Sequence, residues 1–291
     1  MYYLQVVVRL TRGDLAGTEE HFARGLKFFE DPAIWPLPPL RLGPFAAASW
    51  NAWLLGRADL ARQRLARMMA EANQNNPAEV AWSGCLGALS YLMLSESERA
   101  EMLVARALEL SEKYQMPFFA EHARCYLGLA RAWLGRPSKG VALVRQAIAG
   151  FAAVGTHNDA FTFALAESQA LSGDIGDALE TIEQFLQPDR PDANKAIQPE
   201  AFRLRGELQT KQGRREPAEA DFRTALTLAR SMGAKTLELH AVTSLARLLR
   251  DTGRRDEADT ALAEIYNWFT EGFDTADLKE AKALLEELSA T

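Results

Sequence analysis

The feature that most constrains this chain is a turn that recurs roughly every 40 residues. Each turn separates two stretches long enough to form one short helix each. A small residue stands seven positions before all but the first turn and five positions after every turn, and a large apolar residue stands nine positions after it. The turns fall at Gly13, Gly56, Ser95, Gly135, Gly173, Gly213 and Gly253.

This alternation of small and large residues has a direct physical meaning. Two helices that cross closely need a side chain no larger than alanine or serine at the contact, and a bulky apolar residue fills the wedge beside it. Around the turn at Gly135 the small residues are Gly128 and Gly140, and the bulky one is Val144. The pattern predicts an all-α fold built from stacked helical hairpins, in which each unit contacts its neighbours.

We therefore expect a single elongated domain over residues 1–291, made of seven hairpins and closed by a C-terminal capping helix. Phe273 and Asp274 begin this last helix in the prediction, with Asp274 as N-cap, Asp277 in the first turn and Phe273 packed on Leu278. The hairpins are expected at about 2–30, 44–73, 79–113, 118–154, 159–186, 199–232 and 236–271, and the capping helix at 274–290.

Two connections are long and rich in proline. The segments 30–44 and 186–199 cannot be helical throughout, because proline removes a backbone donor and clashes with the preceding turn. Insertions in stacked repeats often edge the binding surface, and a plain spacer is an equally good interpretation.

The N-terminus lacks any element that would cap the first hairpin. Helical pattern starts at once, so Tyr2, Leu4, Val6 and Val8 are expected to lie partly uncovered. Exposed apolar faces tend to find a partner. We expect self-association through the first hairpin, or shielding by the segment 31–44, and we expect that more protein precedes Met1 in nature.

Composition excludes several classes of partner. The net charge is −6 and the pI about 5.4, without a run of Lys or Arg, so neither nucleic acid nor an anionic membrane is an expected partner. No apolar run approaches the roughly 18 to 20 residues that span a bilayer, and the start does not resemble a signal peptide. A cytoplasmic location is the default expectation.

The sequence offers no arrangement typical of catalysis, of a cofactor or of a metal site. Gly135 to Gly140 has the wrong spacing and context for a phosphate loop, and the four histidines fall in separate repeats without a ligand partner. Cys85 and Cys125 occupy equivalent places on successive first helices, too far apart for a disulfide, so both are expected to be free thiols. We expect a protein that is not an enzyme.

The pattern of small residues in 118–151, LG-x6-G-x4-G/A-x6-A, resembles the tetratricopeptide repeat. The period here is longer than usual, and Arg131 replaces the large aromatic residue that normally follows the small one. The resemblance implies a right-handed superhelical array. The stretches 41–56, 233–248 and 266–285 are similar to the repeat region of multidomain bacterial proteins with a cyclase or other effector domain and a predicted ATPase, which implies a sensor or scaffold segment without those activities.

In tetratricopeptide arrays the first helix of each hairpin lines the concave groove. Carried onto this chain, the resemblance gives an aromatic and apolar half and a charged half. The apolar half comprises Trp50, Trp53, Trp82, Leu89, Leu129, Trp133 and Phe163 as candidate binding residues, and the same offsets include Cys85 and Cys125. The charged half comprises Arg203, Glu207, Arg247 and Arg250.

The tryptophans are equally well interpreted as core residues between neighbouring hairpins. Two functions remain open. The first is a scaffold that binds a peptide or protein domain in the groove. The alternative is a sensor that closes its aromatic half around a small-molecule effector. An enzyme is disfavoured because no catalytic site is visible.

Overall fold

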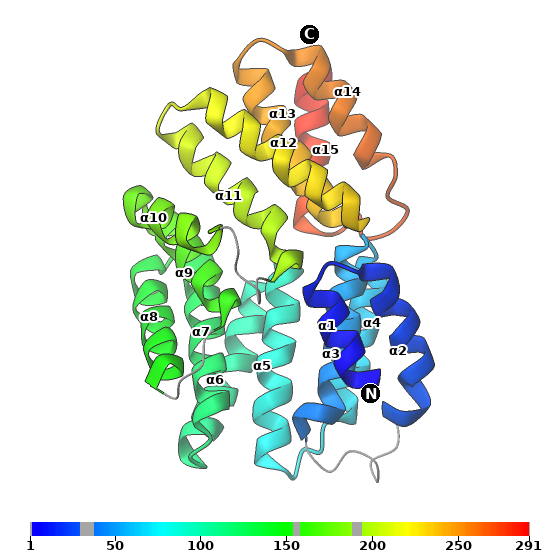
Figure 1. Cartoon of the computed structure of the whole chain (residues 1–291), viewed down its shortest axis with the longest axis vertical. Helices are drawn as coiled ribbons and strands as arrows, with labels where there is room; N and C mark the ends of the chain where they lie inside the picture. Colours follow the sequence, from blue (N-terminus) through cyan, green and yellow to red (C-terminus); the bar gives the residue numbers. More distant parts are fainter. Residues whose placement is uncertain (1, 30–37, 154–157, 188–193, 291) are drawn as a thin grey trace.

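The computed structural model describes residues 2–29, 38–153, 158–187 and 194–290, and within these it contains fifteen α-helices, one 3-10 helix and no strand. The predicted all-α, right-handed superhelical array is confirmed. Figure 1 shows its arrangement, with α11 to α15 lying across one end of the upright helices α1 to α9.

The helices alternate as first and second members of hairpins. Neighbouring pairs are α1 (Tyr2–Thr11) with α2 (Leu15–Phe29), α3 (Pro38–Leu54) with α4 (Ala58–Glu71), α5 (Pro77–Met93) with α6 (Ser97–Lys113) and α7 (Pro117–Trp133) with α8 (Pro137–Ala153). They continue with α9 (Asp159–Ser172) and α10 (Ile175–Phe185), the 3-10 helix η1 (Lys195–Ile197), α11 (Gln198–Lys211) and α12 (Arg215–Met232), α13 (Lys235–Asp251) and α14 (Arg255–Tyr266), and α15 (Ala276–Ser289).

The turn positions predicted from the sequence are confirmed. All seven marker residues have positive φ, including Ser95 at 60° where glycine would be expected. At Gly135 the turn is closed by backbone bonds to Ala132 and, from Arg136, to Arg131, and φ is 76°. Glycine reaches this left-handed conformation without the steric penalty that a Cβ would bring.

The predicted close crossing of paired helices is also confirmed between α7 and α8. A Cβ placed on Gly128 would lie 2.8 Å from the carbonyl oxygen of Gly140, and one on Gly140 would lie 2.6 Å from that of Gly128. The two backbones therefore touch at this point, and the fully buried Val144 fills the space beside them.

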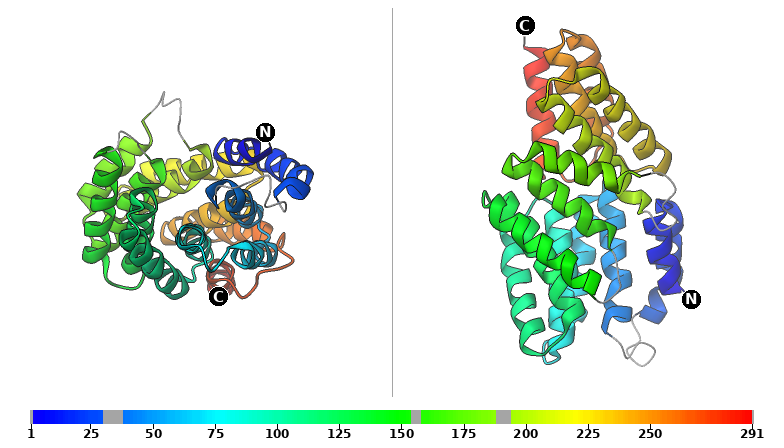
Figure 2. Two further views of the ribbon diagram at one scale, coloured as in Figure 1. Left: turned by 90° about the horizontal axis from the view of Figure 1, so that it is seen from below. Right: turned by 60° about the vertical axis from the view of Figure 1, so that its left-hand side comes forward.

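The superhelix returns to its own beginning, and this was not predicted. Seen from below in Figure 2, the hairpins follow a curved path that brings the last helices beside the first ones. The turn at Gly56 contacts Phe269 and Trp268, and the Thr236 hydroxyl donates to the Trp53 carbonyl oxygen. Residues 183 positions apart in the sequence thus share a hydrogen bond.

Because of this return, the first hairpin is partly covered. Val6 is fully buried in a core cluster that also contains Ala196, Ala229 and Leu237, so its predicted exposure is wrong. Leu4 does face solvent, with 61% of its surface exposed. Later repeats supply the cover that the sequence alone could not locate.

The C-terminal helix packs as expected but starts later. Thr275 is the N-cap of α15, not Asp274, whereas Asp277 does lie in the first turn. Phe273 is about half exposed, and its ring contacts the ring of Tyr266. This ring contact is not the packing on Leu278 that was expected. The stripe on α15 is buried in the core of α13 and α14, at Leu278, Ala281, Leu284 and Leu288.

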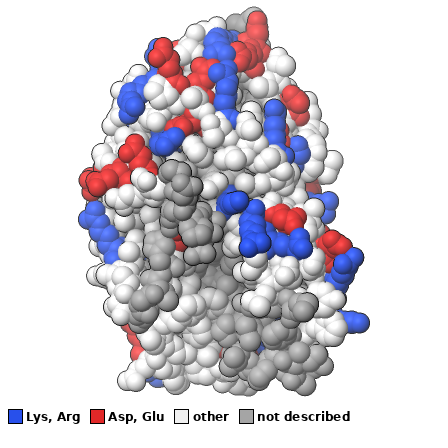
Figure 3. All heavy atoms as spheres, in the orientation of Figure 1, with Lys and Arg blue, Asp and Glu red and all other residues white. Residues whose placement is uncertain are grey.

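The proline-rich connections lie partly outside the described residues, at 30–37 and 188–193. Helix α3 begins at Pro38, earlier than expected, and keeps Pro44 within it. Figure 3 shows acidic and basic side chains interspersed on one face, with charges of both signs over α11 to α15. None of the described helices is long and apolar enough to cross a membrane.

Candidate functional site

A cavity of about 750 Å³ lies on the concave side of the array. It is formed by the ends of the first helices α7, α9, α11 and α13, by the start of α15, and by the turn between α5 and α6. The first helices of successive hairpins lie next to one another around the superhelix. A row of side chains on each of them therefore contributes to one continuous wall of the cavity.

One side of the cavity holds a cluster of paired charges. Nε of Arg203 lies 2.8 Å from Oε2 of Glu200, and its Nη1 lies 2.5 Å from Oε1 of Glu207. All three residues are on α11 at spacings of three and four, which place them on one helical face. The Ser244 hydroxyl on α13 donates to the same Glu207 oxygen at 2.9 Å.

His240 extends this cluster to α13 and α15. Its Nδ1 lies 2.9 Å from Oε1 of Glu200 and its Nε2 lies 3.3 Å from Oδ2 of Asp277. Burial disfavours the imidazolium, but the charge of Glu200 and the hydrogen bonds to both carboxylates outweigh it and raise the pKa of His240 to about 10. We call Glu200, Arg203, Glu207, His240 and Asp277 the ion-pair cluster.

The two carboxylates respond in the opposite direction. Burial would raise their pKa, but the charge of Arg203 and the charge and hydrogen bond of His240 lower the pKa of Glu200 to about 2. The hydrogen bond and charge of His240 likewise lower the pKa of Asp277 to about 2. Glu200, His240 and Asp277 are therefore all charged throughout the neutral range.

Glu167 on α9 lines the same cavity but has no hydrogen bond or ion pair among the described residues. Burial raises the pKa of Glu167 to about 7, and the charges of Glu200 and Glu207 act in the same direction, while Arg203 and His240 oppose them. A carboxyl group without a partner at a cavity wall is available to a ligand.

The cavity is also lined by apolar side chains. Trp133 on α7 is 50% exposed and Leu171 on α9 is 42% exposed, and both line the cavity together with Leu204 and Leu208. Exposed large apolar side chains beside fixed polar groups are the usual composition of a binding pocket.

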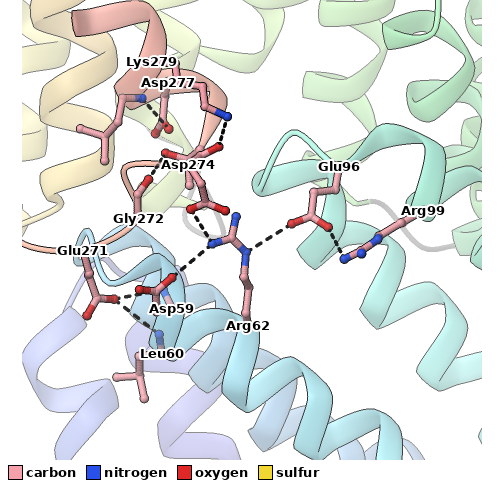
Figure 4. Close-up of polar contacts among 12 residues, drawn as sticks. Asp59, Leu60, Arg62, Glu96, Arg99, Glu271, Gly272, Asp274, Asp277 and Lys279 are labelled. Atoms are coloured by element: carbon pink, nitrogen blue, oxygen red, sulfur yellow. Dashed lines mark hydrogen bonds and ion pairs between the residues drawn. The ribbon is translucent and has the colours of Figure 1, made fainter.

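A second contact region, which we call the clasp, joins the second and third hairpins to the C-terminal segment beside the cavity (Figure 4). It consists of Asp59 and Arg62 on α4, Glu96 at the start of α6, and Glu271 and Asp274 before α15. Arg62 pairs with Asp59, Glu96 and Asp274 at 3.2, 3.3 and 3.0 Å. A Glu271 carboxylate oxygen accepts the backbone N–H of Asp59 at 3.0 Å.

The structure brings together four of the residues predicted from the sequence. Trp133, Arg203, Glu207 and Arg247 all line the cavity. Arg250 lies outside it and pairs with Asp251 and Glu287. The remaining predicted residues do not line this cavity: Trp50, Trp53, Trp82, Leu89, Leu129 and Phe163.

Three of the predicted tryptophans pack mainly against neighbouring hairpins. Trp50 donates to the Ser90 hydroxyl at 2.9 Å, Trp53 packs edge-on against His240, and Trp82 stacks on Phe119. All three are half-buried against core clusters, which agrees with the core interpretation.

The two cysteines also belong to the core. Cys85 and Cys125 are free thiols, as expected, but both are fully buried, so their predicted place on the groove is wrong. Burial raises the pKa of both thiols above the ordinary value.

Sequence reasoning missed Glu167, Glu200, His240, Ser244 and Asp277. His240 and Ser244 extend the charged stripe of α13 at helical spacing, which is a signal that the pattern did contain. Asp277 carried no such signal, because its partner lies 37 positions away. Among the described residues no group of three or more His, Cys, Asp or Glu is placed to hold a metal ion.

Fold and cavity together define the class: this is a tetratricopeptide-like helical repeat array with a polar concave site. Three solved structures share its fold over nearly the whole chain. NprR in complex with its cognate peptide NprX has a TM-score of 0.64 at 12% identity, covering 99% of this chain and 81% of that one. A Rap protein complexed with Competence and Sporulation Factor has a TM-score of 0.61 at 13% identity, covering 99% and 78%.

The apo form of the quorum sensor NprR from B. thuringiensis has a TM-score of 0.56 at 13% identity, covering 98% of this chain and 80% of that one. At such identities the likeness establishes the fold alone. No protein-family model matches the sequence, and no curated protein matches it.

Proposed function

We propose that this chain is a non-catalytic scaffold that binds a peptide or a short protein segment in its concave cavity. The observation that carries the proposal is the cavity of about 750 Å³, lined by polar side chains of α9, α11, α13 and α15 and by the exposed Trp133 and Leu171. Its volume lies within the roughly 300 to 1,000 Å³ typical of ligand sites. An extended segment presents apolar and polar groups in turn, which suits such a wall.

The fold likeness supports the same proposal. NprR with its peptide NprX and Rap with Competence and Sporulation Factor are peptide or factor complexes of similar arrays. We transfer from them only the idea that the inner surface of this chain holds a segment of another molecule.

The state of the charged groups favours binding over catalysis. His240 faces a carboxylate at each ring nitrogen and stays protonated at neutral pH, so it is not free to accept a proton as a general base. Arg203 is held by two glutamates. Groups that hold one another in this way give a ligand a fixed surface.

The wider context belongs to the same proposal. Residues 1–291 act as one solenoid domain, serve as a regulatory repeat segment of a larger bacterial signalling protein, and use the exposed Leu4 and Val8 of the first helix for self-association. The polar character of the cavity favours a peptide over an apolar effector in the aromatic half.

A selection of random hexapeptides displayed on phage tests the proposal. Enriched peptides should bind the unmodified chain with a dissociation constant in the micromolar range or below. Leu171→Arg places a long cation on the apolar wall and should abolish this binding. Met102→Arg, which changes a more exposed apolar residue on α6 that does not line the cavity, should leave it intact.

Two outcomes would contradict the proposal. A selection that enriches no peptide would do so, as would peptides that bind Leu171→Arg as tightly as the unmodified chain while circular dichroism shows that both variants are folded.

A further inference from the structure

The charges around the cavity are unequal. Arg203 and His240 face four carboxyl groups from three helices, and each of the two cations pairs with two of these groups. The four carboxyl groups are Glu167 on α9, Glu200 and Glu207 on α11, and Asp277 on α15.

The other charged groups of the cavity do not restore the balance. Arg247 pairs with Glu280, and Arg99 pairs with Glu96. Lys211 and Glu98 are both exposed at the edge, and their charges offset each other. The inner wall therefore keeps an excess of negative charge once Glu167 is ionised.

Glu167 is the group through which this excess can be used. Every other carboxylate named here except Glu98, at the exposed edge, already accepts from a cation, whereas Glu167 has no partner among the described residues. A ligand anion would have to displace one of the existing ion pairs, while a ligand cation needs only to approach Glu167.

From this geometry we infer, resting on the proposed function, that the cavity recognises a basic group of the bound segment. The ammonium or guanidinium of that group pairs with Glu167, and an adjacent apolar residue packs on Trp133 and Leu171. The common chemistry is a cation next to an apolar side chain, supplied by a Lys or Arg side chain or by a free N-terminus.

The electrostatics of Glu167 agree with this role. Burial and the neighbouring Glu200 and Glu207 raise the pKa of Glu167 to about 7, so a proton occupies the place of a missing positive partner at slightly acid pH. A ligand cation that replaces this proton meets a carboxylate in an environment poor in water, where a charge-assisted hydrogen bond is strong.

Isothermal titration calorimetry with four pools of synthetic hexapeptides tests the inference. Every peptide is built from Leu, Phe, Gly and one further residue type. In three of the pools this residue is Lys, Gln or Glu, and the peptides are capped at both ends. The fourth pool contains Gln and has a free N-terminus. The Lys pool, or the pool with a free N-terminus, should bind at least about tenfold more tightly than the capped Gln pool.

Two variants locate the effect. Glu167→Gln should remove most of this preference, because the neutral amide lacks the charge. Glu109→Gln changes the net charge equally but lies exposed on α6 and should leave the preference unchanged.

The outcomes separate the inference from the proposed function. If no pool binds, the proposed function fails and the inference with it. If the pools bind equally, or the Glu pool binds best, the inference is wrong while the proposed function stands. An equal loss in Glu109→Gln and Glu167→Gln would also overturn it, because net charge alone would then explain the preference.

Discussion

Arg62 and Asp274 are 212 positions apart in the sequence, and their side chains form an ion pair of 3.0 Å. Arg62 belongs to α4 and Asp274 to the loop before α15, and the same guanidinium also reaches Glu96 at the start of α6. One side chain thus joins the second hairpin, the third hairpin and the C-terminal segment (Figure 4).

Replacing Arg62 with Met should loosen the clasp. Asp59 and Asp274 are exposed and Glu96 is partly buried, so each pair contributes little, and we expect the free energy of unfolding to fall by about 1–2 kcal/mol in total. Small-angle X-ray scattering should show a larger radius of gyration. Arg106→Met, which removes an exposed arginine from α6, should change neither quantity. An unchanged radius of gyration in Arg62→Met would show that the clasp does not hold the second hairpin and the C-terminal segment together.

A second prediction concerns the crossing of α7 and α8. Gly128→Leu should lower the free energy of unfolding by several kcal/mol, since even a Cβ would collide with the Gly140 carbonyl. Gly176→Ala is the contrasting change, because no atom lies near its added Cβ. It should stabilise the chain by about 0.5–1 kcal/mol through helix propensity. Urea unfolding measures both, and equal effects would contradict this account of the crossing.

His240 predicts a pH dependence of stability. Its pKa is raised to about 10 in the folded chain from about 6.5. Its ion pairs therefore stabilise the fold fully below about pH 6.5, and this contribution is lost as the pH rises towards 10. Between pH 6 and pH 9, urea unfolding should show a loss of stability that is larger by at least about 1 kcal/mol than the loss in His240→Gln, where the contribution of Glu167 remains. His21→Gln is the control, because His21 contacts only the Gly17 carbonyl oxygen through Nδ1 and an aromatic ring, and the loss should persist there.

Glu167 predicts an effect on stability that needs no ligand. Its pKa is raised to about 7 from 4.5, so the folded state binds a proton that the unfolded state has already released. The associated stability is present below about pH 4.5 and disappears as the pH rises through 7. Glu167→Gln should therefore be more stable than the unmodified chain at pH 8 and equally stable at pH 4.5. A variant less stable at pH 8 would show that the carboxylate has a partner.

The elements of the fold were predictable because their causes are local. Gly128, Gly135 and Gly140 lie within 13 residues, and the contact they permit is set by the geometry of two consecutive helices. The start of α15 was displaced because Thr275, not Asp274, takes the N-cap position.

The cavity was predictable only in part. Arg203 and Glu207 followed from their places on a first helix, but the curvature that brings Glu96 and Trp133 to the same cavity as Asp277 is the sum of small rotations over several hairpins. No local spacing records that sum. The place of Trp53 could not be predicted for a related reason, since its side chain meets His240 only because the superhelix returns to its start.

That return changes how such a chain can evolve. An open stack of hairpins can gain or lose a unit in its middle, because every junction resembles the next. Here the loss of one hairpin would move Asp274 away from Arg62 and Phe269 away from Gly56, and the insertion of one would do the same. The contacts between the second hairpin and the C-terminal loop therefore require the present number of repeats between them.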